Sequence, residues 1–145
     1  MKYDPALEKR VWDRVMGLPP AIPAVQIAEM ANWLRESART YHALGRRMTR
    51  DRHVLQHLAR DNARAAETFG AIYYVLTGKR VPWNRQKPQR IMDAAKTLRE
   101  LHQQTLRREK DCEAFAQRGG DFAETFTETA QMLHRHAKTI LRLLR

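Results

Sequence analysis

Apolar residues recur at intervals of three, four or seven along most of this chain, which is the spacing of one face of an α-helix. Four stretches carry the pattern. Their inward-facing positions are Ile27, Ala31, Leu34, Ala38, Tyr41 and Met48; then Val54, Leu55, Leu58, Asn62, Ala65, Phe69, Ile72 and Leu76; then Ile91, Ala95, Leu98, His102, Thr105, Glu109, Cys112 and Ala116; and finally Phe122, Phe126, Thr129, Leu133, His136, Ile140 and Leu144. The pattern predicts four amphipathic helices.

Prolines and glycines set the predicted boundaries. The prolines lie at 5, 19, 20, 23, 82 and 88, so the stretches 24–81 and 89–145 contain none and helices can run through them almost unbroken. Asp4 and Pro5 predict a short helix that ends near Met16, Thr49 or Asp51 is the expected cap of the second long helix, and Asp121 is the expected start of the last one. We therefore predict an N-terminal helix with a proline-rich linker over 1–21 and a single bundle domain over 22–145.

The lengths of the connections predict how the helices are arranged. The first two long helices are joined by very few residues, which makes them antiparallel neighbours. The segment KRVPWNRQKP before the third helix has no periodicity. About 11 such residues can stretch about 36 Å, close to the length of about 37 Å expected for a helix of about 25 residues. The chain is thus predicted to be all-α, a ferritin-like four-helix bundle with one long crossover.

Charge and cysteine content narrow the function classes. Twenty-seven Lys and Arg against 16 Asp and Glu give a net charge of +11, so anionic partners are physically plausible. The single cysteine and the charged N-terminus, which lacks the apolar core of a signal peptide, predict a reduced, cytoplasmic protein. No run approaches the roughly 18 apolar residues that span a bilayer, so we expect no membrane insertion.

The motif LxxLxxDNxRAAETFGAIYYVLTG in the second long helix, the aromatic Tyr41 and the start RVWDRVMG together resemble rubrerythrin-like, ferritin-like bacterial proteins. The resemblance implies a four-helix bundle that holds two irons between four carboxylates and two histidines, with Glu-x-x-His motifs on the second and fourth helices. It also implies an activity similar to that of ferroxidases and peroxide reductases.

Carried over position by position, most of these ligands are missing. The motif of the second helix lands on Asn62 and Ala65, that of the fourth on Leu133 and His136, and the first helix places Leu34 at its ligand position. An alignment of 58–69 with 129–140 supports this register, because it superposes these same positions as repeats. Two iron ions need several anionic oxygens, so a stable di-iron centre is not expected to form.

Glu109 of the third helix and His136 are the remaining candidate metal ligands. We expect no cofactor; the alternative is partial occupancy by iron or another divalent metal held by these two residues, with help from Asn62. The structural alternative for His136 is a core histidine that hydrogen-bonds Glu109 or Tyr41. The structural alternative for Glu109 is a buried carboxylate paired with His102 or His136.

The prediction for function is a non-catalytic scaffold or binding protein. Its first alternative is a metal-dependent oxidase or peroxide reductase of the rubrerythrin type, with a site rebuilt from Glu36, Glu109, His102, His136 or a second subunit. Glu36 itself is expected to face away from Leu34. Cys112 is expected to be a small buried hydrophobe, because no resolving cysteine accompanies it.

A basic protein that associates with nucleic acid is the second alternative. Two clusters could carry it: Lys79, Arg80, Arg85, Lys87 and Arg90 around Trp83, and Arg46, Arg47, Arg50, Arg52 and His53 at the first turn. The competing interpretation is a solvated surface. The apolar face of the N-terminal helix predicts docking on the bundle, with Trp33 as its receptor, or a homodimer contact.

Overall fold

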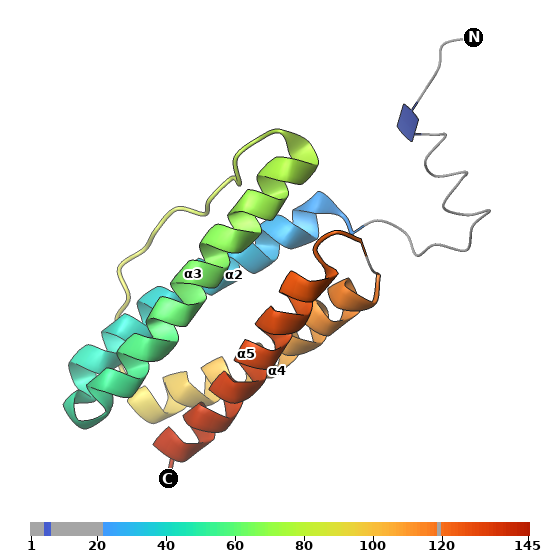
Figure 1. Ribbon diagram of the computed structural model, residues 1–145. Helices are drawn as coiled ribbons and strands as arrows, with labels where there is room; N and C mark the ends of the chain where they lie inside the picture. The colour runs from blue at the N-terminus through green and yellow to red at the C-terminus, as the bar shows by residue number, and fades with distance from the viewer. Residues whose placement is uncertain (1–4, 7–21, 119) are drawn as a thin grey trace.

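The computed structural model describes residues 5–6, 22–118 and 120–145. From residue 22 onward, the described chain contains four long helices and one 3-10 turn: α2 (Ala24–Arg47), η1 (Thr49–Asp51), α3 (Arg52–Thr77), α4 (Ala94–Gln117) and α5 (Ala123–Leu143), as Figure 1 shows. The described residues form no strand, which confirms the all-α class. None of their helices has the length and hydrophobicity that a membrane crossing requires. The helix predicted up to Met16 lies outside the described residues, except for Pro5 and Ala6, which are helical.

Local sequence sets two of the helix ends clearly. Gly78 ends α3 in the left-handed conformation, with φ of 71°, and its N–H donates to the Tyr74 carbonyl at 2.7 Å; glycine adopts this φ without steric cost. Asp93 caps α4, because its carboxylate accepts a hydrogen bond from the Lys96 N–H at 3.1 Å. The last helix begins at Ala123, two residues after the predicted start at Asp121.

The four helices form two antiparallel hairpins joined by a long crossover. The short connection through η1 pairs α2 with α3, and α4 pairs with α5. Between the hairpins, residues 78–93 run along the length of the bundle, from the end of α3 to the start of α4 at the opposite end (Figure 1). The two helices that this segment joins therefore run in the same direction, as the reach of the linker predicted.

Polar side chains of α2 hold the crossover against the bundle. The Asn32 amide donates to the Pro82 carbonyl at 3.3 Å, and its oxygen accepts from the Asn84 N–H at 2.7 Å. Further along, the Arg47 guanidinium donates to the carbonyl of Ile91 at 3.0 Å, and the Ile91 side chain is buried. The crossover is thus attached at both of its ends.

The core consists of two apolar clusters, one toward each end of the bundle. The first, which we call the aromatic cluster, contains Ile27, Ala28, Met30, Ala31, Trp33, Leu34, Ala65, Ala66, Phe69, Ile72, Val81, Cys112, Phe115, Phe126, Ala130 and Leu133. The second, which we call the leucine cluster, contains Tyr41, Ala43, Leu44, Leu55, Leu58, Ala59, Ile91, Leu98, Leu101 and Ile140. Both clusters take residues from all four helices.

The predicted inward faces are correct except near helix ends and on α4. Val54 and Leu76 are 39% and 48% exposed, because they belong to the first and last turns of α3, outside its buried stretch from Leu55 to Ile72. On α4, Ala95 is exposed, whereas Leu101, which the predicted stripe omitted, is buried. Positions 101 and 102 both border the inward face, and burial of leucine costs less than burial of the neighbouring histidine.

Candidate functional site

Three of the positions at which the family resemblance implies metal ligands carry buried apolar side chains. Leu34 on α2 and Leu133 on α5 are both 0% exposed, and Ala65 on α3 is also buried. All three belong to the aromatic cluster. These positions therefore contribute hydrocarbon to the core and no oxygen or nitrogen ligand.

Next to these positions, a layer of polar side chains crosses the bundle. Each helix contributes one buried residue to what we call the polar layer: Ser37 from α2, Asn62 from α3, Thr105 from α4 and His136 from α5. Along every helix the polar residue falls between the members of the aromatic cluster and those of the leucine cluster. The polar layer therefore separates the two apolar parts of the core.

The α2–α3 half of the layer is joined by hydrogen bonds. The Asn62 amide donates to the Ser37 hydroxyl at 2.8 Å, and that hydroxyl donates to the Leu34 carbonyl one turn earlier at 3.0 Å. Asn62 is 0% exposed, and a buried amide requires such partners because desolvation without them is costly. Its nitrogen is therefore engaged within the protein and does not face a metal position.

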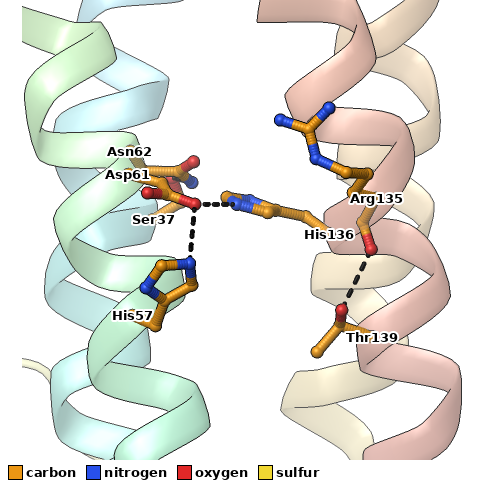
Figure 2. A network of polar contacts seen from close by, with 7 residues as sticks. All are labelled: Ser37, His57, Asp61, Asn62, Arg135, His136 and Thr139. Carbon is orange, nitrogen blue, oxygen red and sulfur yellow. Dashed lines mark hydrogen bonds and ion pairs between the residues drawn. The ribbon is translucent and has the colours of Figure 1, made fainter.

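His136 bridges the two hairpins through Asp61. The His136 Nε2 lies 2.9 Å from Asp61 Oδ2, and their side chains are 4% and 27% exposed (Figure 2). His57, one turn before Asp61 on α3, places its own Nε2 3.6 Å from the same oxygen at the surface. Burial lowers the pKa of His136 from its ordinary value, and the contact with Asp61 opposes this shift. His136 is thus a core histidine, as the structural alternative expected, but with a different partner.

Tyr41 completes the surroundings of His136. The two rings meet edge to face, with their centroids 6.4 Å apart and an angle of 85° between their planes. Burial raises the pKa of Tyr41 to about 12, and the neighbouring Thr105 hydroxyl opposes that rise. At neutral pH the Tyr41 hydroxyl is therefore protonated and uncharged.

The structure does not bring the two predicted metal ligands together. Glu109 pairs with His134, whose Nδ1 lies 2.7 Å from Glu109 Oε1, and this carboxylate is 13% exposed. The expected pairing of Glu109 with His136 or His102 is wrong, because α5 directs His134 toward α4 and His136 toward α3. In the part of the chain that the structure describes, no group of three His, Cys, Asp or Glu side chains is arranged to hold a metal ion.

The remaining candidates lie apart from the polar layer. Glu36 is exposed on α2, as predicted, and accepts a hydrogen bond from the Asn84 amide of the crossover at 3.3 Å. Cys112 is 0% exposed within the aromatic cluster. Burial and, to a lesser degree, nearby Asp111 raise the pKa of its thiol to about 12, so the prediction of a small buried hydrophobe is confirmed.

Trp33 is covered by α4. Its indole N–H donates to Gln104 at 3.0 Å, and the Arg108 guanidinium lies 5.7 Å from the ring centroid. The N-terminal segment that was expected to dock on Trp33 lies outside the described residues.

Sequence reasoning missed Asp61, Ser37 and the role of Thr105. Asp61 is adjacent to the motif position at Asn62 and one turn beyond His57, and this spacing was the available signal for a contact on the surface of α3. Ser37 and Thr105 are small hydroxyl residues, which occur in many helices and gave no signal of a shared layer. Their assembly into one layer depends on the axial register of the four helices.

Basic residues gather at one end of the bundle. The α2–α3 turn, the start of α4 and the end of α5 all lie at this end in Figure 1. We call it the basic end; its Arg and Lys residues are Arg46, Arg47, Arg50, Arg52, Lys96, Arg142 and Arg145. Of the basic cluster around Trp83, Arg90 is the residue nearest to the basic end along the chain. Trp83 itself contacts α2, because the guanidinium carbon of Arg35 lies 4.9 Å from the centroid of its ring.

Comparison with known proteins finds no relative of this chain: no family model, no curated protein and no solved structure matches it.

Proposed function

We propose that this protein is a ferritin-like bundle that has lost its di-iron site and acts as a non-catalytic scaffold or binding protein. The observation that carries the proposal is the complete burial of Leu34 and Leu133 at positions where a di-iron bundle needs carboxylates. The paired hairpins, the long crossover and the motif of α3 support the family assignment. A pair of iron ions carries at least four positive charges, and leucine side chains cannot compensate that charge.

Iron loading of the purified protein tests this proposal. We expect far less than one iron per chain after anaerobic incubation with ferrous iron and removal of the excess, and no oxygen consumption on exposure to air. The matched positive control restores the motif positions with Leu34→Glu, Asn62→Glu, Ala65→His and Leu133→Glu, after circular dichroism has shown that this variant folds. Two irons per wild-type chain with oxygen consumption would instead establish the alternative, a metal-dependent oxidase or peroxide reductase.

The basic end supports a second candidate, association with nucleic acid. The first turn of the bundle and the end of α5 bring Arg46, Arg50, Arg142 and Arg145 to one end, so the positive charge there is not confined to the cluster at the first turn. A polyanion would bind there through its phosphates without reading bases.

Binding of a fluorescent DNA duplex at several salt concentrations tests this candidate. We expect affinity to fall steeply with salt, and the variant Arg46→Glu with Arg50→Glu to lose most of it, because both side chains are exposed. The control, Lys79→Glu with Arg80→Glu, makes the same change of charge at the opposite end of α3 and should retain binding. Equal loss in both variants would mean that net charge alone is responsible. A homodimer, which light scattering would detect, also remains a prediction.

A further inference from the structure

The polar layer and the adjacent Tyr41 of the leucine cluster contain hydrogen-bonding groups that the protein itself does not satisfy. Among the described residues, four buried side-chain atoms lack a hydrogen-bond partner: Tyr41 Oη, Asn62 Oδ1, Thr105 Oγ1 and His136 Nδ1. Their residues are 0%, 0%, 0% and 3% exposed, and each comes from a different helix. Buried polar atoms nearly always have a partner, so four of them in one region point to a bound molecule.

The contacts around these atoms place their residues close to one another in the bundle. The ring of Tyr41 touches that of His136 edge to face, and the Thr105 hydroxyl neighbours the Tyr41 hydroxyl. Asn62 binds Ser37, which lies one turn before Tyr41 on α2. Figure 2 shows Asn62, Ser37 and Asp61 facing the imidazole of His136 from the opposite hairpin. The four atoms therefore belong to the middle of the bundle, between the aromatic and leucine clusters.

The chemistry of the four atoms defines what they can bind. The Asp61 carboxylate accepts a hydrogen bond, so the proton of the neutral His136 ring lies on Nε2 and leaves Nδ1 as an acceptor. Asn62 Oδ1 is an acceptor as well, because the amide nitrogen donates to Ser37. The hydroxyls of Tyr41 and Thr105 both donate and accept. Two acceptors and two hydroxyls suit a small neutral molecule that also donates and accepts hydrogen bonds.

A cation fits this site poorly. None of the four atoms carries a negative charge, and the nearest carboxylate, Asp61, is engaged by His136 at the outer edge of the layer. Burial of an ion without a counter-charge is far more costly than burial of water. Water needs two to four polar partners and little space, and the polar layer together with Tyr41 offers four.

We infer that the polar layer is an internal water-binding site, in which one or more water molecules link Tyr41, Asn62, Thr105 and His136 and so join all four helices. His136 forms the outer wall of this site. Its Nε2 side, together with Asp61 and His57, lines an open groove of about 570 Å³ between α3 and α5. We expect water molecules to pass this imidazole when they exchange between the internal site and solvent.

Nuclear magnetic resonance of the full chain in water tests the inference directly. We expect cross-relaxation between water and two protons, the Tyr41 hydroxyl proton and the His136 Hε1, with the sign that marks water bound for longer than about a nanosecond. Thr105→Val should abolish the signal at the Tyr41 hydroxyl or reduce it several-fold. Thr129→Val is the matched control, because Thr129 is also buried but donates to the Thr125 carbonyl outside the layer, and it should leave the signal unchanged.

Three results would overturn the inference. The first is an absence of water contacts at both protons in a wild-type protein whose spectrum shows it to be folded. The second is an equal signal in Thr105→Val and Thr129→Val, since the water would then not depend on the layer. The third is a shift of the His136 resonances on addition of stoichiometric Zn²⁺ with loss of the water contacts, which would identify a cation site. The addition of Zn²⁺ tests the layer around His136, whereas the iron-loading test concerns the positions of Leu34 and Leu133, so either proposal can fail without the other.

Discussion

The aromatic cluster and the polar layer lie side by side in one bundle but are stabilised in different ways. In the aromatic cluster, Phe126 packs against Phe69 and Phe115 with ring centroids 5.6 and 5.4 Å apart, and these contacts require only apolar surfaces of suitable shape. In the polar layer, Asn62 and His136 each need a particular atom at a particular distance. Burial of apolar surface is sufficient to stabilise the aromatic cluster. The hydrogen bonds of the polar layer also require the correct direction between donor and acceptor.

The difference explains why the centre of the bundle has two kinds of packing. Leu34 and Leu133 extend the aromatic cluster toward the centre, where their burial contributes hydrophobic free energy. The neighbouring polar residues cannot join that cluster without partners, so they bond to one another and to Asp61. The centre is therefore partly apolar and partly polar, and the two parts should respond differently to mutation.

The largest effect is expected from truncation in the aromatic cluster. Phe126→Ala removes a ring that is 2% exposed and leaves a cavity between Phe69 and Phe115, which should lower the free energy of unfolding by about 3–5 kcal/mol. Urea denaturation followed by circular dichroism measures this change. Phe122→Ala, at the half-buried position just before the same helix, should cost clearly less. Equal costs would mean that the cluster does not dominate the stability of the bundle.

A smaller effect is expected where the polar layer meets the surface. Asp61→Ala removes the hydrogen-bond acceptor of His136 and leaves a buried N–H unpaired, at an expected cost of about 1–3 kcal/mol. Asp61→Asn retains an acceptor oxygen and should cost less. The same denaturation experiment compares the two variants, and a cost for Asp61→Ala no greater than that for Asp61→Asn would contradict a bridging role for this carboxylate.

These two regions also mark how far the sequence could predict the structure. The helices, the crossover and most inward faces follow from periodicity and from the positions of proline and glycine, because both act within one segment. The burial of Leu34, Cys112 and Leu133 was predictable for the same reason. These residues need no specific partner once their helix face is known.

The partners in the polar layer could not be predicted in this way. His134 and His136 are two residues apart and point to different neighbouring helices, so the rotation of α5 decides which of them meets Glu109 and which meets Asp61. Helix rotation within a bundle depends on the packing of all four helices. The sequence indicated a polar remnant in the core correctly, but it paired the wrong residues.

The pH dependence of stability should come from the polar layer and not from the aromatic cluster. Burial depresses the pKa of His136 below its ordinary value of 6.5, against the effect of Asp61, while His57 and Arg135 lower it further. The unfolded chain therefore binds more protons as the pH falls below about 6.5. This contribution to stability is complete above that pH and is lost as the pH falls toward the lower pKa of the folded state.

Denaturation of the wild type and of His136→Gln between about pH 7.5 and about pH 5 measures this contribution, which cannot exceed about 1.4 kcal/mol per pH unit for one proton. The difference between the two proteins should grow in favour of the wild type as the pH rises through this range. A difference that is independent of pH would show that His136 does not titrate differently in the folded state.

The smallest effect is expected at Glu109, even though its contact with His134 is as short as any in the bundle, at 2.7 Å. His134 is 55% exposed, so water screens the pair and replaces its hydrogen bonds after mutation. Glu109→Gln should therefore change the free energy of unfolding by about 0.5 kcal/mol or less, well below the effect of Asp61→Ala. A loss larger than that of Asp61→Ala would reverse the comparison, because it would place the essential polar contact of the bundle between α4 and α5, and the layer around His136 would then be secondary.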